Sequence, residues 1–245
     1  MRALSRKVAR PTRVVGAEKS QNERWQKPMD GSYIVYGSPG SGSVPVEAAL
    51  ALIGAPYKMI GESVLRDVAH NPAVLKVNPL GQVPALVLPG GEVMTESAAI
   101  LIWLADRYPD AALAPAPTDQ RRPAFLRWMA YVSSAIYGLA WVRGDPMRII
   151  SDERQAQVVL DRTANRRADC WRWMDTQIEP HRYLLGDDLS VLDLYVATVS
   201  RWLPGRTRFY REAPKMAEIV RRVDTEPRLA ELWKARFPFH DGWEG

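Results

Sequence analysis

The chain has little of the side-chain chemistry on which many common functional sites depend. Its 245 residues include one cysteine, Cys170, and three scattered histidines, His70, His181 and His240. A single cysteine excludes an internal disulfide framework, and these few thiol and imidazole groups form no metal-ligand cluster in the sequence. A lone cysteine also fits a reducing, cytoplasmic setting. The sequence therefore predicts a protein without a metal centre.

Long apolar runs are also missing. No stretch approaches 18 uninterrupted apolar residues, so the sequence predicts no membrane span. Hydrophobic residues make up 47% of the chain and charged residues 25%, which is ordinary for a globular protein. A chain of this length has room for one large domain or two small ones.

Acidic residues are scarce only at the start of the chain. Residues 1–32 hold eight of the 33 basic residues and three of the 28 acidic ones, which leaves 25 of each sign in the rest. The whole net charge of +5 thus belongs to a segment with few apolar residues, which we expect to be a disordered basic extension. Its arginine-rich start loosely resembles an organelle transit peptide, although an extended start of the chain is the favoured interpretation. A neutral body argues against a broad nucleic-acid-binding surface.

The sequence pattern of residues 33–109 predicts a mixed α/β fold. A β-prone run at 33–36 is followed by a loop over 37–43, a helix that ends before Gly54 and a second strand at 57–60. This β-α-β order predicts a parallel pair of strands with a right-handed crossover. The expected later elements are a short helix within 62–76, strands at 85–88 and 92–94, and a helix over 97–108.

The rest of the body reads as entirely helical. Residues 110–120 are rich in alanine and proline and are the best linker candidate. The hydrophobic pattern after them predicts helices over 122–142, 151–178, 190–203, 214–223 and 226–236. The expected organisation is a basic extension over 1–32, an α/β domain over 33–109, a linker, and an all-α domain over 121–245. Ser190 and Asp193 have the spacing of a capping box, which is a structural feature.

The stretch from Asn78 to Leu86, Asn-Pro-Leu-Gly-Gln-Val-Pro-Ala-Leu, predicts a turn that leads into a short buried strand. Pro84 has no backbone N–H to donate to a neighbouring strand. Its position therefore suggests an edge of the sheet with which another group, such as a ligand, pairs. With the Glu96-Ser97 pair that follows, this stretch resembles the thioredoxin-like domain of the glutathione transferase superfamily. The resemblance runs from about Tyr33 to the C-terminus.

The resemblance implies a glutathione site. It implies that Pro84 is cis and that the backbone of Val83 pairs with the cysteinyl part of glutathione. Three further roles are implied for polar side chains: the γ-glutamyl end of glutathione binds at Glu96 and Ser97, the tripeptide backbone at Gln82, and the glycine carboxylate at His70.

The loop over 37–43, Gly-Ser-Pro-Gly-Ser-Gly-Ser, lies between a strand and a helix N-terminus, which favours an anion. Gly37 and Gly42 have the spacing of a phosphate-binding loop, but no lysine precedes the serine. The other candidate anion is a thiolate. The resemblance places Ser41 at the catalytic serine of plant-type enzymes of the family, with Ser38 and Ser43 as rival donors. Another, bacterial branch of the family has a catalytic cysteine at the position that Gly42 occupies here. This chain therefore lacks that cysteine.

The resemblance therefore implies a bacterial-type glutathione transferase with a serine in its catalytic loop. Glutathione is the implied cosubstrate, a small hydrophobic electrophile the implied second substrate, and a homodimer the implied assembly. Tyr137 and Trp141, on the first long helix of the all-α part, are the candidates for binding the electrophile. The alternatives are a glutathione-dependent dehalogenase, ether lyase or peroxidase of the same fold, or a non-catalytic glutathione-binding protein.

Overall fold

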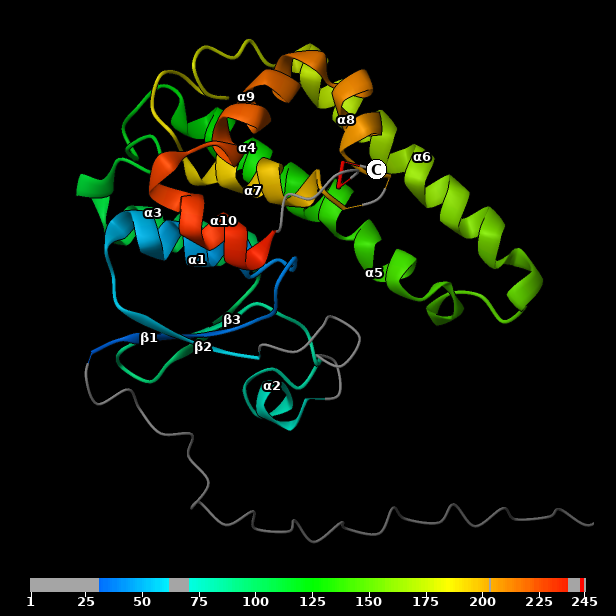
Figure 1. Cartoon of the computed structure of the whole chain (residues 1–245), viewed down its shortest axis with the longest axis horizontal. Coiled ribbons are helices and arrows are strands. Elements are labelled where there is room, and N and C mark those ends of the chain that lie inside the picture. The colour runs from blue at the N-terminus through cyan, green and yellow to red at the C-terminus, as the bar shows by residue number, and fades with distance from the viewer. Residues whose placement is uncertain (1–30, 62–70, 203, 238–242, 245) are drawn as a thin grey trace, which may run out of the picture.

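The computed structural model describes residues 31–61, 71–202, 204–237 and 243–244 (Figure 1). Two sequence-based predictions therefore lie outside the described residues. One is the disordered basic extension over 1–32, of which only Gly31 and Ser32 are described, and the other is the role of His70.

Four short strands form one mixed sheet with the order β2-β1-β3-β4. β1 pairs with β2 in parallel, as the β-α-β pattern predicted, and with β3 in antiparallel fashion. β3 pairs with β4 in antiparallel fashion through a tight hairpin. The strands are β1 Tyr33–Tyr36, β2 Tyr57–Ile60, β3 Ala85–Val87 and β4 Val93–Thr95.

Helices cover both faces of this sheet (Figure 1). Side chains alternate along a strand, so successive residues contribute to opposite faces. Val35 and Leu86 join the core shared with the helices α1 and α3, whereas Tyr36, Ala85 and Val87 form a small second core with α2. The helices are α1 Val44–Ile53, α2 Pro72–Val77 and α3 Ser97–Arg107.

The remainder of the described chain is helical, and its centre is the helix α7. All nine residues of α7 are buried, and seven of them are apolar or aromatic, as expected for a helix at the centre of a core. It contacts α1 and α3 of the sheet half as well as α4 and α9. The helices of this half are α4 Arg122–Tyr131, α5 Leu139–Gly144, α6 Ala156–Gln177, α7 Val191–Val199, α8 Arg206–Glu212, α9 Pro214–Asp224 and α10 Ala230–Arg236.

This architecture confirms the predicted fold class, a thioredoxin-like α/β part followed by a helical part. One continuous hydrophobic core joins the two, because it includes Leu50 and Leu101 of the sheet half together with Trp171 and Leu194 of the helical half. Both Nε and Nη2 of Arg236 on α10 lie 2.9 Å from Oε2 of the fully buried Glu47 on α1. The division into two domains at residues 110–120 stays a proposal.

The predicted capping box at the start of α7 is present. The Ser190 backbone N–H donates to Asp193 Oδ2 over 2.8 Å, and the Leu184 N–H donates to Asp193 Oδ1 over 2.8 Å. The Ser190 hydroxyl also lies 2.6 Å from Oδ2. Asp193 thus fixes both the start of α7 and the chain that leads into it.

The predicted single helix over 122–142 is wrong. A π-helical turn over Val132–Tyr137 separates α4 from α5, and the Gly138 N–H donates to the Ser133 carbonyl, five residues back, over 3.0 Å. A Cβ atom on Gly138 would lie 2.9 Å from the Ser134 carbonyl oxygen. The wide turn therefore requires a residue without a side chain at its end, and hydrophobic periodicity does not reveal this.

Other helix boundaries also differ from the predicted ones. The helix expected from 151 begins at Ala156, because the Asp152 side chain accepts from the Arg154 N–H and starts a short 3₁₀ turn first. The helix expected to reach 203 ends at Val199. α8 was not predicted, since its seven residues carry only two aromatic side chains, Phe209 and Tyr210, among charged ones.

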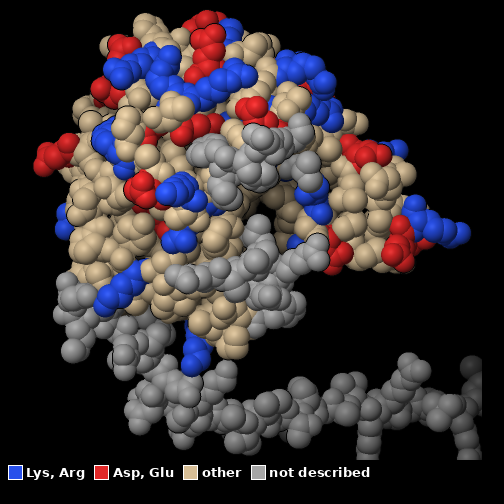
Figure 2. All heavy atoms as spheres, in the orientation of Figure 1, with Lys and Arg blue, Asp and Glu red and all other residues tan. Residues whose placement is uncertain are grey.

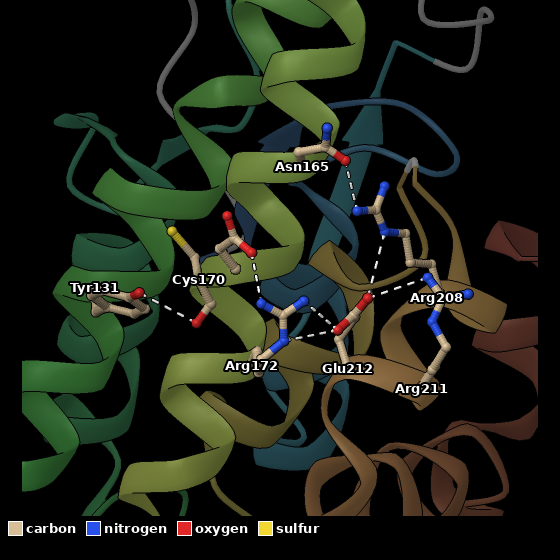
Figure 3. A network of polar contacts seen from close by, with 8 residues as sticks. Tyr131, Asn165, Cys170, Arg172, Arg208, Arg211 and Glu212 are labelled. Atoms are coloured by element: carbon tan, nitrogen blue, oxygen red, sulfur yellow. Dashed lines mark hydrogen bonds and ion pairs between the residues drawn. The ribbon is translucent and has the colours of Figure 1, made fainter.

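Charged contacts join α6 to α8 at the surface. Figure 3 shows Arg172 and Arg208 converging on Glu212, which lies 2.6 Å from the Arg172 guanidinium and 3.8 Å from that of Arg208. Arg208 also donates to Asn165 Oδ1 over 2.7 Å. Such exposed pairs add little stability individually. On the face shown in Figure 2, charges of both signs are intermixed over the helical part.

None of the helices in the described ranges is both long enough and apolar enough to cross a membrane.

Candidate active site

The turn before β3 is held by the side chain of Asn78. Asn78 Nδ2 donates to the Gln82 carbonyl over 2.8 Å, and its Oδ1 accepts from the Leu80 N–H over 3.2 Å. The Val83–Pro84 peptide bond that follows is cis, as the resemblance implied. Pro84 is buried, Val83 is partly buried and the Gln82 side chain is exposed. The turn thus presents Gln82 and the backbone of Val83 at the end of the sheet.

The start of α3 is the second element of the site. Glu96 precedes the helix with a φ of 65°, a left-handed conformation that is uncommon for a residue with a side chain and is found at functional sites. Its side chain is exposed, whereas Ser97 is buried and its Oγ lies 2.8 Å from the Tyr195 hydroxyl of α7. The predicted γ-glutamyl contacts therefore occupy a helix N-terminus, where the backbone N–H groups favour a carboxylate.

The serine loop is the third element, and its hydroxyl groups face inward. Ser41 is 3% exposed, and its Oγ accepts from the backbone N–H groups of Ser38 and Ser43 over 3.3 and 3.2 Å. Ser43 Oγ donates to the Ser38 carbonyl and lies 2.9 Å from Ser41 Oγ, so the Ser41 hydroxyl donates to Ser43. Ser38 Oγ is buried without a hydrogen-bond partner among the described residues. The hydroxyls of Ser41 and Ser43 thus brace the loop, whereas that of Ser38 does not.

Aromatic residues of the helical half contact the cis-proline turn and the serine loop. The Tyr137 hydroxyl lies 3.4 Å from the Val83 carbonyl oxygen, to which it donates. Trp202, which follows α7, donates from Nε1 to the Gly40 carbonyl over 2.7 Å. The rings of Tyr137 and Trp202 meet edge to face with 4.7 Å between centroids. The helical half therefore contacts both the cis-proline turn and the serine loop.

The two tyrosines nearest the site are held in the protonated form. Burial raises the pKa of Tyr195 to about 12, although hydrogen bonds from Ser97 and Ser133 oppose this rise. Burial, followed by the nearby Tyr195 and Glu96, raises the pKa of Tyr137 as well. Both phenols consequently keep their protons at neutral pH, and the Tyr137 hydroxyl is a hydrogen-bond donor.

The structure brings some predicted residues together and leaves others apart. Val83 and Tyr137 are in direct contact, and Ser97 is linked to them through Tyr195. Trp141 on α5 is 45% exposed, and its contacts are with Arg148, which donates to its carbonyl and stacks on its ring. Its predicted part in electrophile binding stays a prediction.

Sequence reasoning missed Tyr195 and Trp202. Both lie in or just after an apolar helix, where aromatic residues usually serve packing, so nothing in the local pattern marked them. A cavity of about 490 Å³ lies elsewhere, between the start of α4 and the end of α6, and is lined by Arg121, Trp128 and His181 among others. The described residues contain no group of histidine, cysteine and acidic side chains that could hold a metal ion.

Comparison with known proteins agrees with this geometry. Residues 43–107 match the model of the glutathione S-transferase N-terminal domain. The chain is 32% identical over 203 residues to the uncharacterised GST-like protein YncG of Escherichia coli, covering 82% of this chain and 96% of that protein.

Two solved structures with glutathione bound have similar folds. A Sulfitobacter glutathione transferase homologue superposes with a TM-score of 0.72 at 25% identity, covering 82% of this chain and 97% of its own. A sphingomonad glutathione S-transferase gives a TM-score of 0.67 at 25% identity, with 83% and 98% covered. From the similarity to YncG over nearly its whole length, together with the domain match, the chain belongs to the glutathione S-transferase family.

Proposed function

We propose that this protein is a glutathione transferase that attaches the thiolate of glutathione to a hydrophobic electrophile. The observation that carries the proposal is that the turn held by Asn78, with the backbone of Val83, adjoins the start of α3, where Glu96 adopts a positive φ, because Ala85 pairs with Thr95. Two related structures with this fold hold glutathione. We infer that glutathione is the cosubstrate of this chain too.

The proposed binding mode uses backbone and side-chain groups together. The backbone of Val83 pairs with the cysteinyl part of glutathione, and Gln82 binds the tripeptide backbone. Glu96 and Ser97 receive the γ-glutamyl end, whose amino group suits the Glu96 carboxylate and whose carboxylate suits the N–H groups at the start of α3. His70 stays the sequence-based candidate for the glycine carboxylate.

The chemistry begins with ionisation of the thiol. A free thiol has a pKa near about 8.5, so only a few per cent is thiolate at neutral pH. A hydroxyl donor at the sulfur and the N-terminus of α1 favour the ionised form, and the released proton passes to water. The sulfur electron pair then forms a carbon–sulfur bond. Either the bond to the leaving group breaks with its electron pair, or a double bond accepts the electrons and is protonated.

Ser41 is the sequence-based proposal for the donor at the sulfur. Its hydroxyl already donates to Ser43 and accepts from two backbone N–H groups. Service as a donor would require this hydroxyl to rotate away from Ser43, which breaks the 2.9 Å contact inside the loop.

Several finer features belong to the proposal. The electrophile is a small hydrophobic molecule bound near Tyr137 and Trp141, and the biological role is detoxification in the cytoplasm. The assembly is a homodimer, to which exposed apolar side chains such as Leu126 and Trp173 on neighbouring helices, each 41% exposed, are suited. Sedimentation at micromolar concentration tests the assembly, since a monomer mass would contradict it.

Calorimetric titration with reduced glutathione tests the proposed binding. We expect saturable one-site binding by the wild-type chain and weaker binding by Glu96→Ala, because the variant loses the carboxylate that faces the γ-glutamyl amine. Glu92→Ala is the matched control, since it removes an exposed carboxylate at the far end of the same hairpin. No binding at about 10 mM, well above the usual range of substrate affinities, would reject the transferase proposal in favour of an interaction protein.

An electrophile screen then separates the alternatives. Conjugation of an aromatic halide or an activated alkene supports the transferase, whereas reduction of a hydroperoxide without conjugate supports the peroxidase. Binding without turnover of any tested electrophile points to a non-catalytic glutathione-binding protein.

A further inference from the structure

The Tyr137 hydroxyl lies where the serine loop and the cis-proline turn approach each other. A Cβ atom on Gly42 would be 2.2 Å from Tyr137 Oη and 2.8 Å from its Cε2. The same Oη donates to the Val83 carbonyl over 3.4 Å. The phenol hydroxyl therefore occupies the space that a side chain at residue 42 would need. It lies beside the backbone segment proposed to pair with the cysteinyl part of glutathione.

The position of Tyr137 is fixed by its surroundings. It is the last residue of the π-helical turn, which inserts an extra residue into the helix and resets the direction of the side chains that follow. Its ring packs edge to face on Trp202 at 4.7 Å and lies 6.1 Å from the ring of Tyr195. A donor held by packing needs little reorganisation when a ligand arrives.

The hydroxyl of Tyr137 is also easier to redirect than that of Ser41. Its bond to the Val83 carbonyl is long, at 3.4 Å, whereas Ser41 and Ser43 are 2.9 Å apart and Ser41 also supports two backbone N–H groups of the loop. Hydrogen bonds weaken as they lengthen beyond about 3.2 Å. Turning the Ser41 O–H toward a ligand breaks the 2.9 Å contact with Ser43, while turning the Tyr137 O–H costs one longer and weaker contact.

We propose that Tyr137 is a catalytic residue, whose hydroxyl donates a hydrogen bond to the sulfur of bound glutathione in the space beside Gly42. This inference rests on the proposed function. The cysteinyl N–H of glutathione takes over the Val83 carbonyl, and the Tyr137 O–H turns to the sulfur. Ser41 then keeps the shape of the loop. The phenol retains its proton throughout, and the thiol proton leaves to water.

The protonation state of Tyr137 suits this role. Burial raises the pKa of Tyr137, and the negative charge of Glu96 adds to the rise, so the side chain is a donor across the physiological range. A hydrogen bond donated to the charged form of a group lowers the pKa of that group. Tyr137 is therefore expected to increase the thiolate fraction of glutathione without itself ionising.

Tyr137→Phe removes the hydroxyl and keeps the ring. The test measures the thiolate ultraviolet absorbance of the glutathione complex against pH, together with calorimetric affinities for glutathione and S-methylglutathione. A hydrogen bond to a charged group is worth enough to shift the pKa of the thiol by about one to two units. We expect Tyr137→Phe to raise the pKa of the bound thiol by this amount and to leave the affinity for S-methylglutathione, which has no ionisable thiol, unchanged.

Tyr131→Phe is the matched control. Tyr131 is the last residue of α4, six residues before Tyr137, and its hydroxyl donates to the Cys170 carbonyl on α6. We expect this variant to match the wild type in thiol pKa and in both affinities. Ser41→Ala is expected to change the pKa of the bound thiol less than Tyr137→Phe does.

Each contrary outcome has a distinct meaning. A wild-type thiol pKa in Tyr137→Phe overturns the inference, and a raised thiol pKa in Ser41→Ala alone assigns the donor to Ser41. Weakened binding of S-methylglutathione by Tyr137→Phe with no change in thiol pKa assigns Tyr137 a packing role. Failure of the wild-type chain to bind either ligand rejects the proposed function as well, and is recognised because the control variant fails equally.

Discussion

The two halves of the molecule contribute to the site in different ways. In the sheet half, the serine loop, the cis-proline turn and the start of α3 follow one another between Gly37 and Ser97, and each is a short motif with its own backbone geometry. In the helical half, Tyr137, Tyr195 and Trp202 come from separate elements and meet the site through packing. The first half supplies shape and backbone groups, and the second supplies hydroxyl and ring contacts.

The hydroxyl groups show this difference most clearly. Ser38, Ser41 and Ser43 are all buried, and the last two are hydrogen-bonded within their own loop. The Tyr137 and Tyr195 hydroxyls cross between the halves, to Val83 and Ser97. Because Ser41 and Ser43 already bond to each other, their hydroxyls are less free to act as donors than a hydroxyl that arrives from outside the loop. The comparison therefore predicts that changes in the helical half alter the sulfur chemistry more than changes in the loop hydroxyls.

The largest effect on stability is expected from removing the side chain that caps α7, the helix that carries Tyr195. Asp193→Ala leaves the buried N–H groups of Leu184 and Ser190 without their acceptor, and each orphaned donor costs on the order of 1–3 kcal/mol. We expect the free energy of unfolding to fall by about 3 kcal/mol. Urea denaturation measures it. Asp187→Ala, at an exposed carboxylate of the preceding loop, is the control and should change stability by less than about 0.5 kcal/mol.

The same residue gives the stability a dependence on pH. Burial raises the pKa of Asp193 to about 6, against about 3.9 in an unfolded chain. Between roughly pH 4 and pH 6 the folded protein keeps a proton that the unfolded chain has released, so this contribution to stability decreases as the pH rises, by at most about 1.4 kcal/mol per pH unit. Asp193→Asn cannot titrate. Parallel curves of unfolding free energy against pH for the variant and the wild type would contradict the assignment.

A smaller effect is expected at the junction between the halves. Gly42→Ala introduces a Cβ atom 2.2 Å from Tyr137 Oη, and overpacking of this kind costs about 1–3 kcal/mol. Combined with Tyr137→Ala, the same substitution should cost less by about 1 kcal/mol or more, because the obstructing ring is gone. Gly90→Ala is the control, since no atom lies within 4 Å of its added Cβ. Equal costs of Gly42→Ala in both backgrounds would show that the two residues are not in contact.

Much of the sheet half could be predicted from the sequence because its signals are local. The turn residues before β3, the alternation along the strands and the helix boundaries at Val44 and Ser97 each depend on neighbouring residues. The cis bond at Pro84 came from the family resemblance, since a cis and a trans proline are identical in sequence.

The contribution of the helical half could not be predicted in the same way. Tyr137 was expected to bind the electrophile, but the direction of its side chain depends on a π-helical turn that hydrophobic periodicity treats as ordinary helix. The inward orientation of Ser41 depends on where Ser43 and the backbone of Ser38 lie in space. Tyr195 and Trp202 reach the sheet half through Ser97 and Gly40, which are 98 and 162 residues away in the sequence. Such contacts are decided by packing between elements.

The smallest effect is expected from a substitution that removes one contact between the two halves and keeps the others. It therefore separates what each contact contributes. Trp202→Phe loses the 2.7 Å hydrogen bond from Nε1 to the Gly40 carbonyl and retains a ring beside Tyr137. We expect a loss of about 1 kcal/mol in the free energy of unfolding and a modestly weaker affinity for glutathione, because the serine loop is less firmly held. Trp103→Phe, at a partly buried ring on α3 that packs on Tyr33, is the matched control. Weaker glutathione binding in Trp202→Phe with an unchanged thiol pKa would show that the helical half acts on the sulfur through Tyr137 and on the loop through Trp202, as two separable contacts.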